Sequence, residues 1–217
     1  MKTMMNKYEL KRTLLDVFFP NRCPVCNKVI GRMDYICDNC ADSFVYDNKQ
    51  YSLCGRPLLC VCRYNNKTMP VVIGAKKHRD GSKLSFMAYT IMQKITAHYD
   101  TLPDVLLPVP VHTSDKIRKG YSHIEKVCRE ISEITGIPTV NAVAKTRKTA
   151  QQKTLSKDER QKNLHDCFSV TDKQALKGKH ILIIDDVMTT GSTLTEVYNT
   201  IADCGCSVID FAVFAKV

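Results

Sequence analysis

Two adjacent acidic residues, Asp185 and Asp186, close an apolar run at positions 181–184 and precede a segment of small hydroxyl residues. The apolar run predicts a buried parallel strand, because helices cover both faces of such a strand. We expect a helix to begin at the hydroxyl residues, and the unpaired backbone N–H groups of a helix start favour an anion. Acids beside an anion site can hold sugar hydroxyls or a metal ion. The segment therefore indicates a ligand that carries both ribose and phosphate.

Two other interpretations of this segment compete with the first. In one, Asp185 and Asp186 only end a strand and Ser192 only caps the following helix. Paired acids at the end of so apolar a strand are rare, which weighs against it. In the other, the loop is a Walker A nucleotide site, but the segment lacks the Gly-Lys-Ser/Thr that such a loop requires.

The segment resembles the 5-phosphoribosyl 1-pyrophosphate (PRPP) loop of the type I phosphoribosyltransferases. That resemblance implies that Asp185 and Asp186 contact the 2′ and 3′ hydroxyls of the ribose. It also implies that the hydroxyl-rich loop wraps the 5′-phosphate. The loop residues concerned are Thr189, Thr190, Gly191, Ser192 and Thr193.

Cysteines form a second chemical pattern, near the N-terminus. Two Cys-x-x-Cys pairs, Cys23 with Cys26 and Cys37 with Cys40, are separated by ten residues. Four thiolates at this spacing can hold one tetrahedral ion, so the sequence predicts a structural Zn²⁺ site. A redox-active Cys-x-x-Cys is the alternative, and the doubling of the motif disfavours it.

The other cysteines give a weaker signal. Cys54, Cys60 and Cys62 form a looser set without a fourth ligand nearby, and we interpret them as reduced and partly buried. The total of 11 cysteines is odd, which argues against a fully paired disulfide scaffold. Disulfides are also rare in the cytosol, so clustered thiols indicate metal there.

The composition of the 217-residue chain is that of a globular protein, with 44% hydrophobic residues. Its length allows one ordinary core and a small appendage. No apolar run is long enough to cross a bilayer, and residues 1–20 lack the apolar core of a signal peptide, so we expect a cytoplasmic protein without a transmembrane segment. The net charge of +10 suits a phosphorylated ligand or nucleic acid, and equally suits ordinary solubility.

Apolar periodicity predicts the elements that position these residues. Residues 71–75 and 105–111 are expected to be strands, and a charged turn that contains Lys77 follows the first of them. Residues 84–98 and 122–135 are expected to be helices. A further helix is expected over the start of the chain, at 8–19.

Two basic segments are candidates for contact with a polyanion. Residues 112–120 are expected to form a loop at a strand end, where Lys116, Arg118 and Lys119 can meet a pyrophosphate. A solvated charged turn is the alternative. Residues 145–163 contain seven basic and two acidic residues, which predicts either a surface linker or a lid that closes over the ligand.

Residues 21–217 resemble the ComF family (competence protein F), which joins a cysteine-rich zinc finger to a phosphoribosyltransferase-like domain. The resemblance implies an α/β fold with a mostly parallel sheet flanked by helices. It places the N-terminal helix and zinc-finger module in residues 1–69 and the phosphoribosyltransferase-like domain in residues 70–217. The motifs that carry it are Cys23-Pro-Val-Cys26, Cys37-Asp-Asn-Cys40, Cys54-Gly-Arg-Pro57, Leu107-Pro-Val-Pro110, Lys119-Gly-Tyr121, the run 147–163 and the run 185–193.

Two motifs depart from the family pattern. Tyr51 stands where a further cysteine is usual, and Cys60 and Cys62 are separated by one residue instead of two. The usual Asn-Gln after the Gly-aromatic pair is replaced by Ser122-His123, which changes the hydrogen bonding expected beside the ligand.

The resemblance implies two alternative functions. The first is transfer of the phosphoribosyl group of PRPP to an acceptor, with Mg²⁺ and the basic residues Lys77, Arg118 and Lys119 stabilising the leaving pyrophosphate. The second is the handling of single-stranded DNA in natural transformation with other competence proteins, with PRPP as ligand or regulator. Nothing in residues 1–70 resembles a base-reading pocket, so the sequence names no acceptor. The lid residues of the family pattern are Arg147, Thr149, Gln152, Arg160 and Asn163.

Overall fold

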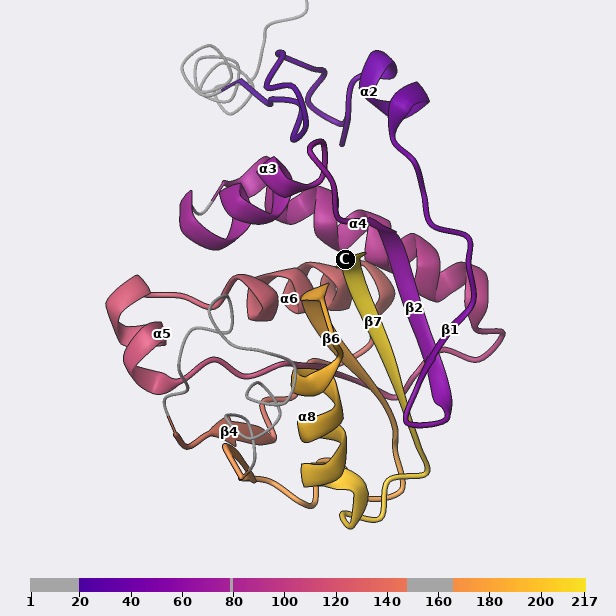
Figure 1. Ribbon diagram of the computed structural model, residues 1–217, viewed down its shortest axis with the longest axis vertical. Helices are drawn as coiled ribbons and strands as arrows, with labels where there is room; N and C mark the ends of the chain where they lie inside the picture. Colours follow the sequence, from indigo (N-terminus) through magenta and orange to yellow (C-terminus); the bar gives the residue numbers. More distant parts are fainter. Residues whose placement is uncertain (1–19, 79, 148–165) are drawn as a thin grey trace, which may run out of the picture.

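The computed structural model of the chain describes residues 20–78, 80–147 and 166–217. Its centre is a five-stranded sheet in the order β1-β2-β7-β6-β3 (Figure 1), in which only β1 and β2 pair antiparallel. The predicted α/β fold with a mostly parallel sheet is therefore confirmed. The strands are β1 (Tyr51–Leu53), β2 (Arg56–Arg63), β3 (Val105–Pro108), β6 (His180–Met188) and β7 (Val208–Lys216).

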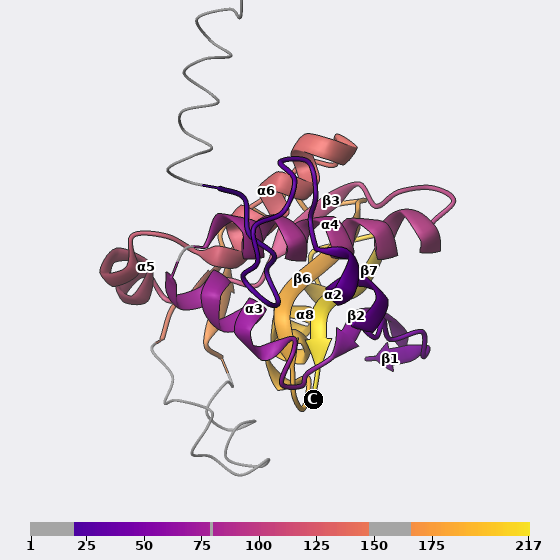
Figure 2. The same ribbon diagram turned by 90° about the horizontal axis from the view of Figure 1, so that it is seen from above.

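Helices cover both faces of this sheet (Figure 1, Figure 2). Leu182 and Ile184 of β6 pack into the core under α4 and α6, whereas Ile181 and Ile183 pack with α8. This alternation follows from the strand itself, in which neighbouring side chains point to opposite faces. Because both faces are buried, the strand is apolar throughout this stretch. The helices are α4 (Gly81–His98), α6 (His123–Thr135) and α8 (Ser192–Ala202).

Residues 20–43 form a small module that lies beyond α4, on the side away from the sheet (Figure 1, Figure 2). It contains the short helix α2 (Asp38–Ser43). The rings of Tyr35 and Tyr89 stack with centroids 4.0 Å apart, which joins the module to α4. The helix expected over residues 8–19 lies outside the described residues.

The main sheet also uses residues from the front segment of the chain. β1 and β2 precede residue 69, yet β2 pairs in parallel with β7 from Leu58 opposite Phe211 to Arg63 opposite Lys216. Backbone hydrogen bonding therefore crosses the expected boundary between residues 69 and 70. The front segment supplies an edge of the sheet as well as the cysteine-bearing module.

The expected strand over residues 71–75 is wrong. This segment forms α3 (Met69–Ile73) and then a one-turn π-helix (Gly74–His78). Pro70 lies in the first turn of α3, where its missing N–H is tolerated. A short apolar run does not by itself distinguish a buried helix from a strand, and β2 already occupies the place beside β7.

The expected loop over residues 112–120 is also mostly helical. α5 (Thr113–Lys119) begins after His112, whose side chain accepts the N–H of Ser114. It ends at Gly120, which adopts a φ of +70°. The loop prediction overlooked this His112 cap, because histidine is not among the common N-cap residues.

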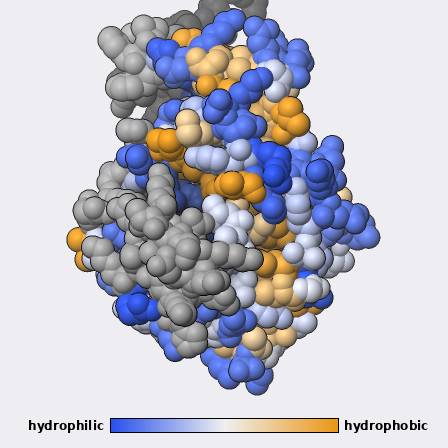
Figure 3. Space-filling view, in the orientation of Figure 1, coloured by the Kyte–Doolittle hydropathy of each residue, from blue (hydrophilic) through white to orange (hydrophobic). Residues whose placement is uncertain are grey.

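A separate antiparallel pair, β4 (Val143–Lys145) with β5 (Phe168–Val170), flanks the part of the basic segment that lies outside the described residues. Among the residues described here, no helix is long and apolar enough to cross a membrane. On the face drawn in Figure 3, apolar residues form separate patches among hydrophilic ones.

Candidate functional site

β6 carries both acidic residues of the central motif and continues past them to Met188. They lie within the strand, close to its carboxyl end, and not after it as the sequence predicted. Neighbours on a strand point to opposite faces, so Asp185 is on the α8 side and Asp186 is on the side of α4 and α6. The carboxyl edge of a parallel sheet is the usual place for a ligand in α/β folds.

Asp186 is almost completely buried, with 3% of its surface exposed. Its Oδ2 accepts hydrogen bonds from Lys76 Nζ at 2.9 Å and from His123 Nε2 at 2.8 Å. Its Oδ1 accepts the backbone N–H of Val187 at 2.8 Å. Burial opposes the charge, but Lys76 and His123 outweigh it and hold the pKa of Asp186 well below its usual range. Asp186 is therefore ionised, and three donors fix its orientation.

Asp185 has the opposite character. Its Oδ1 accepts the backbone N–H of Asp186 at 2.8 Å. Burial and the negative charge of Asp186 raise the pKa of Asp185 to about 7, although Lys76 opposes this. The pair is thus asymmetric: Asp186 is charged throughout the neutral range, whereas Asp185 gains or loses a proton there.

The predicted phosphate loop forms a turn between β6 and α8. Thr190 Oγ1 and Ser192 Oγ lie 2.7 Å apart, and Gly191 precedes the helix with a φ of +81°. The N-cap residue Gly191 gives α8 no side-chain cap, and Thr190 Oγ1 accepts the N–H of Ser192 in a long bond of 3.4 Å. The backbone N–H groups at the start of a helix favour an anion. Asp185 and the five predicted loop residues line one hollow. Its lining residues are Asp185, Val187, Met188, Thr189, Thr190, Gly191, Ser192, Thr193 and Leu194.

Lys76 reaches Asp186 from the π-helix that follows α3. Such turns are rare and frequently occur at functional sites. The sequence permits this turn to approach α4 closely, because Gly74 has no Cβ to collide with the side chain of Lys83. The Lys76 side chain remains 46% exposed in spite of its ion pair.

His123 reaches Asp186 as the first residue of α6. Ser122 caps this helix by accepting the N–H of Glu125 at 3.4 Å. Just before the cap, the Tyr121 hydroxyl donates a hydrogen bond to the backbone oxygen of Ala75. This bond ties the start of α6 to the π-helix, so the elements that bear Lys76 and His123 are held together.

The structure describes only part of the set of basic residues that were predicted to bind pyrophosphate. Lys77 is exposed on the π-helix, next to Lys76. The backbones of Arg118 and Lys119 end α5, and their side chains lie outside the described part of the protein. Lys116 on the same helix forms an ion pair with Glu125 at 2.8 Å.

Only one residue of the predicted lid belongs to the described part of the chain. Arg147 is exposed and follows β4. The others lie outside the described residues: Thr149, Gln152, Arg160 and Asn163.

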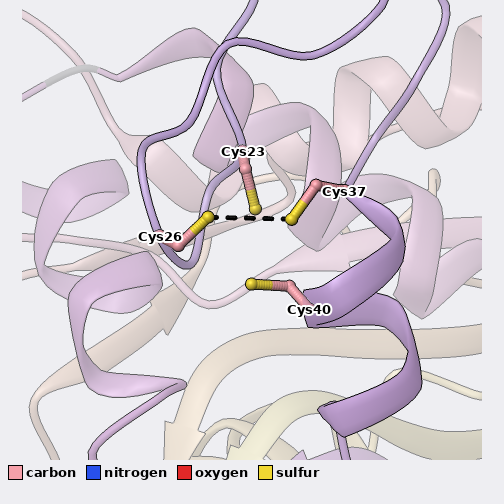
Figure 4. Close-up of side chains that lie close together, drawn as sticks. All are labelled: Cys23, Cys26, Cys37 and Cys40. Atoms are coloured by element: carbon pink, nitrogen blue, oxygen red, sulfur yellow. Dashed lines mark hydrogen bonds between the residues drawn. The ribbon is translucent and has the colours of Figure 1, made fainter.

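The four cysteines of the predicted zinc site converge, as Figure 4 shows, with Cys23 and Cys26 on one turn and Cys37 and Cys40 at the start of α2. All four sulfurs lie within 4.8 Å of one another, and those of Cys26 and Cys37 are 3.7 Å apart. Zinc–sulfur bonds of about 2.3 Å in a tetrahedron require sulfurs about 3.8 Å apart. The cluster therefore fits and supports a structural zinc ion.

The looser cysteine set is distributed differently. Cys60 and Cys62 are buried in β2. Cys54 is exposed at the turn before β2, and its Sγ lies 3.8 Å from Thr195 Oγ1 of α8. The turn of the front segment thus reaches the helix that follows the phosphate loop.

Lys76 and His123 were not among the predicted site residues. The sequence offered a signal for each. Lys76 adjoins Lys77 in the basic run after residue 75, and only a π-turn directs the first of the two to the acids. His123 departs from the family pattern, and its burial beside Asp186 gives that departure a structural role.

Comparisons with known proteins agree with these features. The family described as "Phosphoribosyl transferase domain" matches residues 82–217, and the family described as "Double zinc ribbon domain" matches residues 14–69. "Competence protein F" of Haemophilus influenzae is 32% identical over 114 residues, which cover 52% of this chain and 50% of that protein. "DNA utilization protein YhgH" of Escherichia coli K12 is 25% identical over 198 residues, which cover 86% of each chain. The resemblance to the competence family is therefore confirmed.

Solved structures give weaker likenesses. A purine phosphoribosyltransferase from Pyrococcus horikoshii aligns with a TM-score of 0.40 and 19% identity, over 61% of this chain and 73% of that chain. An adenine phosphoribosyl transferase from Trypanosoma brucei aligns with a TM-score of 0.43 and 12% identity, over 69% of this chain and 56% of that chain.

Proposed function

The chain belongs to the phosphoribosyl transferase domain family, and on this premise we propose that it binds PRPP at the carboxyl end of β6. The 5′-phosphate lies at the start of α8, against the backbone N–H groups of residues 189–193. The ribose hydroxyls lie on the acid pair. One observation carries the proposal: Asp185 lines the same hollow as a hydroxyl-rich turn that opens a helix.

The proposed reaction is transfer of the phosphoribosyl group. The bond between ribose C1 and the pyrophosphate oxygen breaks, and pyrophosphate leaves with the electron pair. A nitrogen acceptor forms the new bond to C1 and releases a proton. Positive charge develops on the ribose ring in the transition state, and the carboxylates of Asp185 and Asp186 stabilise it.

Mg²⁺ fits this site as a partner of the ligand. The ion is usually bound by one or two carboxylates, and phosphate oxygens and water complete its shell. Asp185 offers such a carboxylate beside the hollow, so it would be the protein's ligand for the ion. When bound with PRPP, the ion supplies positive charge to the leaving pyrophosphate.

Calorimetry with PRPP and Mg²⁺ tests the binding, and a screen of nucleobases and ammonia for pyrophosphate release tests the transfer. Asp185→Asn is expected to weaken PRPP binding by about 10- to 100-fold, because a charged hydrogen-bond acceptor is lost. Asp203→Asn is the control, because Asp203 is exposed at the opposite end of α8. Equal affinity of the wild type and Asp185→Asn would refute the assigned site.

A second candidate function is the handling of single-stranded DNA in the cytoplasm during transformation. The relatives, a competence protein and DNA utilization proteins, favour it, as does the net charge of +10. PRPP would then act as a ligand or regulator. Partners would include other competence proteins.

The salt dependence of DNA binding tests this candidate. Affinity for a labelled single strand should fall steeply between 50 and 200 mM salt, because contacts to the phosphate backbone release counterions. It should survive Asp185→Asn, since that substitution adds no negative charge and lies in the ligand hollow. An affinity indifferent to salt would contradict backbone binding.

A further inference from the structure

The ion pair between Lys76 and Asp186 has no role in the PRPP site described so far. Lys76 Nζ lies 2.9 Å from Asp186 Oδ2, and the two side chains differ widely in exposure, at 46% and 5%. His123, the other donor to this oxygen, is 8% exposed. Of the two donors, only Lys76 can leave the carboxylate for a group that arrives from solvent.

The strand gives a bound ligand a direction. The phosphate hollow is on the Asp185 side of β6, together with α8. Lys76 and His123 are on the Asp186 side, together with α4 and α6. The 5′-phosphate and the C1 substituent of a ribose are at opposite ends of the sugar. A ribose that spans the end of β6 with its phosphate at α8 therefore directs its C1 substituent towards Lys76.

We propose that Lys76 is the cation that receives the pyrophosphate group of PRPP, and that it exchanges Asp186 for this group when the ligand binds. The inference rests on the proposed PRPP site. In the empty site the ammonium neutralises Asp186. In the occupied site a ribose hydroxyl donates to Asp186, His123 continues to hold the carboxylate, and the ammonium binds pyrophosphate.

The chemistry of lysine suits this exchange. Its ammonium is a compact charge on a flexible stem with three donors, so it can pair with either anion. The charge of Asp186 raises the pKa of Lys76, so the group is a cation at neutral pH. The π-helix holds the Lys76 backbone beside the start of α6 through the bond from Tyr121 to Ala75, so only the side chain has to move.

Two ligands that differ only in the pyrophosphate group separate this role from a structural one. Calorimetry with Mg²⁺ present is carried out with PRPP and with ribose 5-phosphate. Lys76→Gln is expected to lower PRPP affinity by about 10- to 100-fold, because a charged contact is lost, and to change ribose 5-phosphate affinity by less than about twofold. Lys179→Gln, exposed just before the other end of β6, is the charge-matched control and should leave both affinities unchanged.

Acetylation of the wild-type protein provides a test that needs no variant. Lys76 should react in the empty protein and in the ribose 5-phosphate complex, and PRPP should protect it. Lys179 should react equally in all three states. Mass spectrometry of the peptides reads the result.

The possible outcomes separate the two proposals. Equal losses for both ligands in Lys76→Gln, or no loss, would overturn the role of Lys76, as would a Lys76 that PRPP fails to protect. A wild-type protein that binds neither ligand would instead overturn the PRPP site.

Discussion

Leu53, the last residue of β1, packs so closely on Gly191 that a Cβ on the glycine would lie 2.9 Å from Leu53 Cδ1. Gly191 also has a φ of +81°, a conformation that other residues rarely adopt. The hairpin of the front segment therefore shapes the loop where we propose that the 5′-phosphate binds. The edge strand β1 and the phosphate loop therefore pack directly against each other.

Gly191→Ala is predicted to destabilise the protein by about 2 kcal/mol and to weaken PRPP binding, because it adds backbone strain and a clash with Leu53. Urea unfolding measures the loss. Gly178→Ala is the matched control, since Gly178 has a φ of +69° and open space around it. Gly178→Ala should lower the free energy of unfolding only by the cost of the strained backbone conformation. Equal costs in the two variants would contradict the close packing of Leu53.

Asp185→Asn is predicted to stabilise the empty protein, and more so at pH 8 than at pH 5. Burial and the charge of Asp186 raise the pKa of Asp185 to about 7, whereas an unfolded aspartate titrates near pH 4. Between these values the folded state binds more protons, so its stability falls as the pH rises. The side-chain amide of the Asp185→Asn variant does not titrate, so the variant does not lose this stability as the pH rises. Urea midpoints of both proteins at the two pH values give the difference, and a gain independent of pH would contradict the raised pKa.

Asp210 is the centre of a second buried network, at the amino end of β7. It is 2% exposed and accepts hydrogen bonds from Arg56, Tyr99 and His180 at 3.0, 3.1 and 2.9 Å. Burial opposes its charge, but these three partners outweigh it and lower the pKa of Asp210. The network joins β2, β6 and β7 far from the phosphate loop.

Asp210→Asn is predicted to lower the free energy of unfolding by about 2 kcal/mol at pH 7, because the buried acceptor loses its charge, while the partner Arg56 is 38% exposed and stays partly solvated. The wild-type contribution is present above the unfolded pKa near 4 and is lost as the pH falls towards the lower folded pKa. The cost of the substitution should therefore shrink at pH 3. Thermal unfolding at both pH values measures it. Unchanged PRPP binding is the expected control, and a cost that persists undiminished at pH 3 would contradict the electrostatic origin.

The sequence predicted the central strand, the three long helices and the cysteine cluster because each has a strong local signal. A continuous apolar run such as 181–184 is typical of a strand whose sheet is covered by helices on both faces. The Cys-x-x-Cys spacing encodes the metal geometry directly. Ser122 and Gly136 mark both ends of α6, whose predicted and observed bounds agree within one residue.

The parts that the sequence missed depend on contacts between distant residues. Val71 and Val72 fit a strand or a buried helix equally well, and only the place of β2 beside β7 decides between them. The sequence pattern indicated Lys77 and not Lys76 as a site residue. Which of the two side chains reaches the acids depends on a π-turn, and no local sequence pattern predicts that turn. The pairing of His123 with Asp186 joins positions 63 residues apart, beyond the reach of periodicity.

Cys26→Ser is predicted to release zinc and to unfold residues 20–43, because one of four ligands is lost and the folding of such a module is coupled to its metal. The sheet and PRPP binding should persist, since the phosphate loop and acids lie on β6 and α8. Metal analysis measures zinc, and limited proteolysis followed by mass spectrometry locates the unfolded part. Cys206→Ser is the control, because Cys206 is half-buried beside Ile201 and lies outside the cluster. A fully folded, zinc-free Cys26→Ser protein would show that the metal has no structural role.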